Sequence, residues 1–409
     1  MSPSPPPSPP KPPATRLAWL RQRGASTKAW LQRRWEKRKN FRPGDRSRFV
    51  ASGLGLGALV WFAYFAPGQF GFDATLEVSE LRFTYANNDE RTFLNTINTP
   101  RLVLGGHQAP TGPTTQTLIL RGRFTSPDRN QQAQLDQLKP QSLTLSLADR
   151  NSLLEFATNP KGPIAFSGLL LQPNTRLDRL AYDPAEKDRP ARLDLKLSHC
   201  TPNQNRPCQV RFRLGTGAIK LNGSAIAIAE LPNLRQPTLE FTPAGNSEQV
   251  LTFSALKTLS LDLPATAEAT RDLFSGGLAI RDVQLDRQAD LGQNARDRYT
   301  QSTLLGGEAR LKDKTLKLQA GQYLGFGDNS PGIQRLERLQ FAPKATGLQL
   351  FVSGEAKELS AGLNPKVPTQ TIDPKWLQGI LSDEVIALLV GLCSGVFATL
   401  LGRLLEDDD

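Results

Sequence analysis

Two long runs without charged side chains lie near the two ends of the chain and constrain its fold more than any other feature. Residues Phe49–Phe72 contain no ionisable side chain except Tyr64, and Val385–Gly402 form a second uncharged run. A helix of eighteen residues is about 27 Å long, which is close to the thickness of a bilayer core. The two runs therefore predict transmembrane helices at 49–66 and 385–402.

Each run also has an alternative interpretation. The first could be a cleaved signal peptide, but a basic region of 48 residues precedes it, and cleavage after Ala66 would put Tyr64 where a small residue is required. The second could be the buried helix of a protein core. It is apolar on every side, however, which favours a membrane span.

The positive charge of the chain is confined to its N-terminal segment. Of the net charge of +11, residues 1–48 supply 13 Lys and Arg against two acids, and the remainder holds 37 bases and 37 acids. Because basic flanks stay in the cytoplasm, we expect both termini there and the region between the spans outside, in a periplasm or lumen. The balanced body shows no basic face or recognisable motif, which argues against nucleic acid as a partner.

The segment before the first span has two parts. Residues 1–13 form a proline-rich tail that should be extended and solvated, either as a spacer or as a docking peptide. Residues 14–48 place leucine and tryptophan on a helical stripe among basic side chains, which suits anionic lipid headgroups at the membrane surface. The alternative is a basic flank that merely fixes topology. The candidate membrane-surface residues are Trp19, Trp30, Trp35, Arg33 and Arg34.

The region between the spans is predicted to consist of β-strands. Apolar and polar residues alternate with a period of two in ARLDLKLS, QVRFRL, SLTLSL, TLSLDL, QTLILRGRF and GLQLFVSG. Turn signals such as NPKGP, PAGN and GFGDNSPG separate these runs.

The predicted fold is therefore a membrane-anchored all-β protein. A large antiparallel, sandwich-like or barrel-like extracytoplasmic body at 71–370 would lie between the N-terminal and C-terminal transmembrane helices, followed by an acidic tail at 403–409. A subdivision of the body is suggested near 237–249. Helices are expected in the body at Asp128–Lys139 and Ala267–Phe274.

Two of the three cysteines, Cys200 and Cys208, bracket a short polar loop between two predicted strands. In an oxidising compartment such a pair is best interpreted as a disulfide. Free thiols, a metal site with His199 and a redox pair remain as alternatives, although the metal site lacks a fourth ligand and C-x7-C is an unusual redox spacing. Cys393, inside the second predicted span, is interpreted as a packing residue.

Both predicted spans contain a G-x-x-x-G motif, formed by Gly53 and Gly57 in the first and by Gly391 and Gly395 in the second. Small residues four positions apart let two helix backbones approach closely in lipid. The motifs predict packing of the two spans on each other, on further copies of the chain, or on partner subunits.

No catalytic, cofactor-binding or metal-binding signature emerges from the sequence. The chain has two histidines and no G-x-S-x-G, and its GLGLG run lies inside a predicted span, so a nucleotide-binding loop is excluded. Asp262 and Asp282 would form an acid pair only if the fold brought them together. Gly325–Gly332 (GFGDNSPG) is expected to be a β-turn, with a calcium loop as the alternative.

These features favour a non-enzymatic two-pass membrane protein, without a cofactor, whose extracytoplasmic β-body binds or scaffolds partners in an envelope or membrane complex. It is expected to be a homo-oligomer or a subunit of such a complex. The first alternative is a lipid- or glycolipid-handling protein with a leucine-lined groove. The second is an envelope hydrolase that depends on carboxylates.

Overall fold

The computed structural model divides the chain into two compact units. One is Pro67–Lys375, and the other joins Met1–Ala66 to Trp376–Asp409. Residues 237–249, the suggested subdivision, lie inside the first unit. The structure describes residues 68–107, 117–147, 151–158, 164–199, 208–232, 234, 237–245, 248–253, 256–264, 272–290, 298–343 and 346–374, and helical positions 384, 385, 387, 388, 391, 392, 394, 395, 398 and 399.

The predicted membrane segments are described only in part. The segments that lie outside the described residues are 1–13, 14–48, 49–66 and 403–409. Within the predicted second span at 385–402, every described position is helical, and Val385, Leu388 and Leu392 are exposed. Among the residues that the structure describes, no helix combines the length and the apolar character that crossing a membrane requires.

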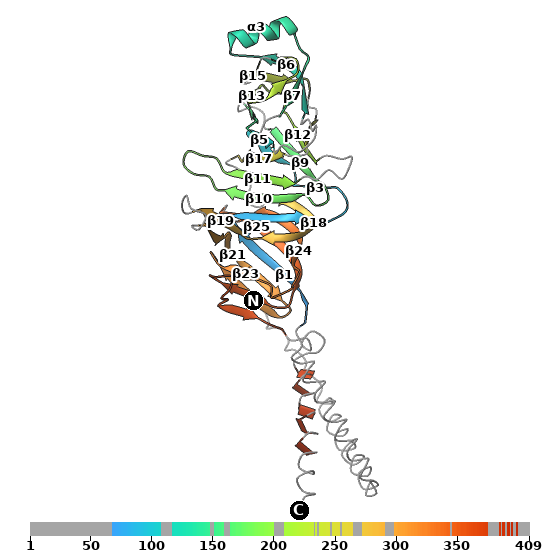
Figure 1. Ribbon diagram of the computed structural model, residues 1–409, viewed down its shortest axis with the longest axis vertical. Helices are drawn as coiled ribbons and strands as arrows, with labels where there is room; N and C mark the ends of the chain where they lie inside the picture. Colours follow the sequence, from blue (N-terminus) through green and yellow to red (C-terminus); the bar gives the residue numbers. More distant parts are fainter. Residues whose placement is uncertain are drawn as a thin grey trace, which may run out of the picture. The chain divides into compact units, whose positions relative to one another are not determined.

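Seventeen strands of the first unit form one continuous antiparallel sheet (Figure 1). Each strand pairs with the next in the order β22 (Lys314–Gln319), β21 (Leu304–Leu311), β1 (Phe70–Val78), β25 (Leu348–Ala356), β24 (Gly332–Phe341), β18 (Asp272–Gln284), β2 (Glu80–Tyr85), β10 (Arg176–Asp183), β11 (Arg192–His199), β17 (Leu256–Asp262), β5 (Arg101–His107), β8 (Leu153–Thr158), β13 (Ile219–Ser224), β15 (Thr238–Pro243), β6 (Thr117–Thr125), β7 (Ser142–Ser146) and β14 (Ala227–Ile228). Most neighbours in this order are distant in the sequence.

The described residues of this unit also form three smaller sheets. The five-stranded sheet contains β16 (Glu248–Phe253), β12 (Cys208–Arg213), β9 (Ile164–Leu171), β3 (Arg91–Phe93) and β4 (Ile97–Thr99). The others are the pair β19 (Asp286–Asp290) and β20 (Arg298–Ser302), and the three strands β23 (Tyr323–Gly325), β26 (Leu359–Gly362) and β27 (Gln370–Ile372).

Part of the core lies between the long sheet and the five-stranded sheet. Phe156 on β8 contacts Phe212 on β12 with ring centroids 5.4 Å apart. Phe93 on β3 contacts Phe83 on β2 at 5.7 Å and Phe274 on β18 at 5.5 Å. The inward side chains of both sheets are almost fully buried. The sandwich-like, antiparallel all-β architecture that the sequence predicted is therefore confirmed.

The period-two alternation identified strands correctly. The six alternating runs correspond to β11, β12, β7, β17, β6 and β25. On β11, for example, Leu193, Leu195 and Leu197 are buried, whereas Lys196 between them is exposed. This is the pattern expected when one face of a strand packs in a core and the other faces water.

One of the two predicted helices of the body is confirmed and the other is wrong where it is described. Helix α3 spans Arg129–Leu138, begins with Asp128 accepting from two backbone N–H groups, and ends with Lys139 in a left-handed conformation. At 272–274, in contrast, the chain is the start of β18, because Leu273 and Phe274 are buried in the sandwich. Tertiary packing has overridden local propensity there.

Candidate functional site

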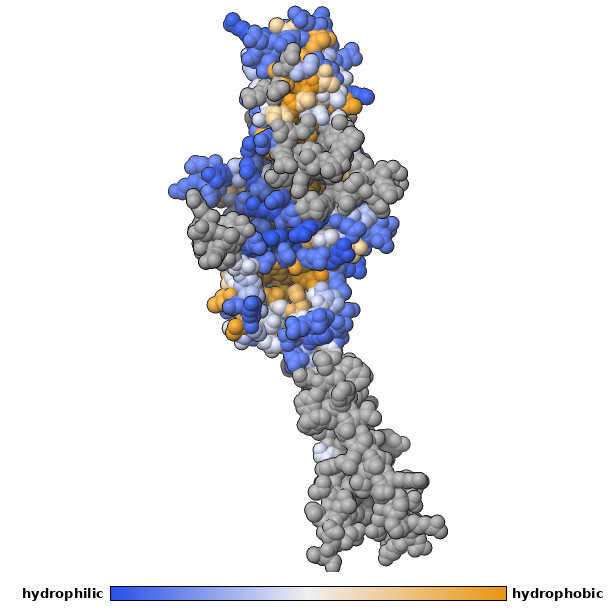
Figure 2. Space-filling view, viewed as in Figure 1, coloured by the Kyte–Doolittle hydropathy of each residue, from blue (hydrophilic) through white to orange (hydrophobic). Residues whose placement is uncertain are grey.

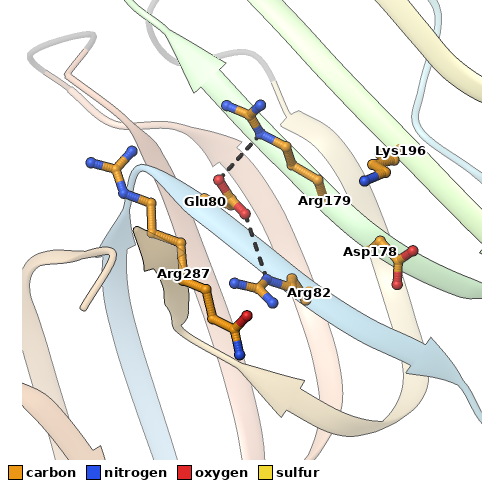
Figure 3. A pocket seen from close by; sticks show the side chains of 7 residues that line it. Glu80, Arg82, Asp178, Arg179, Lys196 and Arg287 are labelled. Atoms are coloured by element: carbon orange, nitrogen blue, oxygen red, sulfur yellow. Dashed lines mark ion pairs between the residues drawn. The ribbon is translucent and has the colours of Figure 1, made fainter. Parts of the chain in front are cut away.

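Side chains of β2, β10, β11 and β19 line an open, strongly charged pocket of about 380 Å³ (Figure 3). Figure 2 shows that hydrophilic residues gather in the part of the view that holds β10 and β11. Three of these strands are neighbours in the long sheet, with Glu80 opposite Ala181 and Arg179 opposite Lys196. The lining residues are Glu80, Arg82, Asp178, Arg179, Lys196, Arg287 and Gln288.

Strand alternation and one irregularity bring these side chains to the same face. On β2, Leu81 and Phe83 point into the core, so Arg82 between them points outward. The register of β10 against β11 shifts between Leu177 and Arg179. Such an extra residue re-aims its neighbours, and both Asp178 and Arg179 consequently lie on the outer face.

Glu80 is the central carboxylate of the pocket. Its side chain is 10% exposed, its Oε1 lies 3.5 Å from Arg82 Nε, and its Oε2 lies 3.2 Å from Arg179 Nε. The backbone carbonyl of Glu80 accepts a hydrogen bond of 2.6 Å from Thr303 Oγ1. Glu80 therefore forms ion pairs with two arginines from neighbouring strands (Figure 3).

The remaining cations of the pocket are not matched by carboxylates. Arg287 donates from Nε and Nη2 to the neutral amide oxygen of Gln301, at 3.1 and 3.0 Å. Lys196 is exposed and makes no ion pair with a described residue. Asp178 pairs with Arg176, which does not line the pocket, at 2.9 Å. Four cations thus face two carboxylates, both of which are already paired.

A second charged cluster joins neighbouring strands of the long sheet. The buried Asp262 on β17 pairs through Oδ1 with Arg192 Nε at 3.0 Å and through Oδ2 with Arg101 Nη1 at 3.5 Å. Arg101 Nε also donates to Glu155 Oε1 at 2.7 Å, and this hydrogen bond raises the pKa of the Arg101 guanidinium. Because both oxygens of Asp262 are occupied, the cluster ties β5, β8, β11 and β17 together.

The acid pair considered from the sequence is not assembled. Asp262 lies on β17, whereas Asp282 lies on β18, and the two strands are not neighbours in the sheet. Asp282 is exposed and pairs with Arg281 at 3.7 Å. The two carboxylates therefore do not form the kind of pair that a glycoside hydrolase requires.

We expect Asp262→Asn to lower the free energy of unfolding by about 2 kcal/mol, because the substitution leaves Arg101 and Arg192 without their buried counter-charge. The loss is small for a broken buried ion pair because both arginines are more than one third exposed, and solvent screens their charges. Chemical denaturation followed by circular dichroism measures the change. Asp282→Asn, at an exposed position, is the matched control and should leave stability unchanged; equal losses in both variants would contradict the prediction.

Only one of the two cysteines of the predicted disulfide is among the described residues. Cys208 begins β12 and is buried, and its Sγ lies 3.7 Å from Thr175 Oγ1. Cys200 lies outside the described residues, and so do the side chain of His199 and Cys393. The pairing of Cys200 with Cys208 therefore stays a prediction.

Other predicted site residues lie partly outside the described chain. Those outside are Trp19, Trp30, Trp35, Arg33, Arg34, Gly53 and Gly57. Gly391 and Gly395 are helical, and in the described part of the chain a side chain at either position would meet open space. Within GFGDNSPG the predicted turn is present at Asp328 and Asn329, and the described residues contain no cluster suited to a metal ion.

The chain was compared with protein families, curated proteins and solved structures. No family model, curated protein or solved structure matches the chain. Its function is therefore inferred from its own residues and their geometry.

Proposed function

We propose that this chain is a non-enzymatic, two-pass membrane protein whose extracytoplasmic β-body binds or scaffolds partners in an envelope or membrane complex. The observation that carries the proposal is the closed core of the body. The leucines and phenylalanines of the facing sheets fill the space between them, as the complete burial of Phe156 and Phe212 illustrates. Binding is then left to the outer surface.

The outer surface offers apolar side chains that suit a protein partner. Ile119 on β6 is 51% exposed and Val250 on β16 is 40% exposed, and these two strands contact each other. Figure 2 shows hydrophobic residues at the surface in the part of the view that holds β6, β13 and β15. Apolar residues gathered on the outside of a closed sandwich are typical of an interaction surface.

The alternatives find less support. Lipid carriage would need an open apolar groove, but the leucines on the inward faces of the described sheets are buried and the pocket described above is lined by charges. A carboxylate-dependent hydrolase would need a pair of available acids, whereas Asp262 is held by two arginines.

The proposed topology rests on the sequence. Spans at 49–66 and 385–402 would place both termini in the cytoplasm and the body in a periplasm or lumen, where Cys200 and Cys208 would form a disulfide. The basic segment 14–48 would lie on anionic headgroups of the inner leaflet. The glycine motifs would mediate packing of the spans within an oligomer or complex.

Native mass spectrometry of the full chain in mild detergent tests the proposal. We expect a fixed oligomer or a stoichiometric partner. Gly391→Leu with Gly395→Leu should weaken that assembly, because larger side chains keep helix backbones apart. Cys393→Leu is the matched control, since helical periodicity puts residue 393 on the opposite side from both glycines.

Two outcomes of this measurement would count against the proposal. A lone chain with neither partner nor fixed oligomer would overturn the scaffold function. A lone chain that retains lipid would favour lipid handling instead. A separate experiment tests the disulfide by counting alkylated thiols before and after reduction. Two further thiols should react after reduction if Cys200 and Cys208 are bonded. An unchanged number of reactive thiols would exclude this disulfide.

A further inference from the structure

We propose that the pocket lined by β2, β10, β11 and β19 binds an oxyanion of phosphate or sulfate type that carries two negative charges. The pocket lies entirely within Pro67–Lys375, so this inference does not depend on the membrane topology proposed above.

The first argument is charge. Arg82, Arg179, Lys196 and Arg287 line the pocket, and its two carboxylates do not neutralise them. Asp178 is paired with Arg176 outside the lining, which leaves Glu80 alone against four cations. A cluster of cations on adjacent strands repels itself unless a counter-ion is present. An anion with two charges would relieve this repulsion.

The second argument is the geometry of the guanidinium groups. Arg82 and Arg179 both contact Glu80 through Nε, at 3.5 and 3.2 Å, and not through the paired outer nitrogens. Figure 3 shows the outer nitrogens of Arg179 turned away from Glu80. No hydrogen bond joins them to another described residue, and Arg179 Nε is itself buried without a hydrogen-bond partner, so its contact with Glu80 is an ion pair only. Such a planar pair of donors matches two oxygens of one tetrahedral anion.

The third argument is preorganisation. Glu80 is almost buried and forms ion pairs with both arginines, and Arg82 Nη2 also donates to the backbone carbonyl of Asp286 at 2.5 Å. This bond connects β2 to β19, the strand that supplies Arg287. Figure 3 shows Arg287 and Lys196 on either side of Glu80. The guanidinium groups that would bind an anion are therefore already restricted in their conformations, and this lowers the entropic cost of binding.

The volume of the pocket indicates what the anion is attached to. At about 380 Å³ it is larger than a single phosphate ion requires, so a phosphate monoester with part of its sugar or glycerol would fit. The shared chemistry is the doubly charged phosphate group. It could come from a soluble phosphate compound or from a lipid headgroup, and the test separates these sources.

Isothermal titration of the full chain in detergent with inorganic phosphate tests the inference. We expect saturable binding to one site per chain, and about tenfold weaker binding for Lys196→Ala with Arg287→Ala. Both side chains are exposed, so the variant should fold normally. The matched control is Arg310→Ala with Lys317→Ala, which removes the same charge from exposed positions of β21 and β22 and should bind phosphate as the wild type does.

Two results would overturn the inference. One is the absence of saturable phosphate binding by the wild type up to about 10 mM. The other is equal weakening in the pocket variant and in the control, which would mean a general charge effect. With binding established, competition by micelles that contain phosphatidic acid, but not by micelles with phosphatidylcholine, assigns the phosphate to a headgroup. Competition by glycerol phosphate alone assigns it to a soluble compound.

Discussion

Replacing Phe93 with alanine should lower the free energy of unfolding of the body by about 4 kcal/mol. Phe93 lies on the three-residue strand β3, is completely buried, and contacts Phe83 and Phe274 of the long sheet. Its removal would leave a cavity where the five-stranded sheet meets the long sheet. Each aromatic pair adds further stabilisation beyond burial, which the substitution would also remove.

Chemical denaturation of the full chain, followed by circular dichroism, measures this loss. Thr92→Ala is the matched control, because Thr92 is the exposed neighbour of Phe93 on the same strand. The control should stay within about 0.5 kcal/mol of the wild type. A loss below about 1 kcal/mol for Phe93→Ala would show that β3 does not close the core as described.

The second large effect is expected at Gly354, where β25 lies between β1 and β24. Gly354 is opposite Phe72 on one side and Ile333 on the other. A Cβ at this position would overlap the carbonyl oxygen of Gly332, which is backbone and cannot rotate away. Gly332 in turn has a φ of 71° and packs under the ring of Phe326. The clash must therefore separate two central strands.

Gly354→Ala should consequently destabilise the body by about 3 kcal/mol, as overpacking of a well-packed site does. Gly71→Ala on β1 is the matched control, since its Cβ would come no closer than 4.0 Å to the carbonyl oxygen of Gly354. The same denaturation experiment compares the two variants. Equal stability of both would mean that β24 and β25 are not packed as closely as the structure shows.

The sequence predicted the strands well because their signal is local. In ARLDLKLS, the leucines and the charged residues alternate over a few positions, and that alternation is sufficient to identify β11 and its buried face. The helix predicted at Asp128–Lys139 also depends on local contacts, because the side chain of Asp128 accepts hydrogen bonds from the first backbone amides of α3. Where the fold depended on distant packing, as for Phe274, the prediction was wrong.

The charged pocket was missed for the same reason. Arg82, Arg179 and Arg287 come from strands far apart in the sequence, and each looks like an ordinary solvated residue of a sheet face. The alternation in ARLDLKLS places Lys196 on the outer face of β11, but nothing near it in the sequence indicates Glu80 or the shifted register of β10. The side chains that line this pocket can be grouped only when the order and register of the strands are known.

The position of β1 has a consequence for how the protein is made. This early strand pairs with β21 and β25, and the hydrogen bond from Ser79 to Thr303 beside it joins residues 224 positions apart. At the usual pace of synthesis, the first strand waits on the order of tens of seconds for its neighbours to emerge. During that time Leu76 and Val78, buried in the finished body, have no sheet to pack in. The first strand is therefore exposed to aggregation until nearly the whole body has been synthesised.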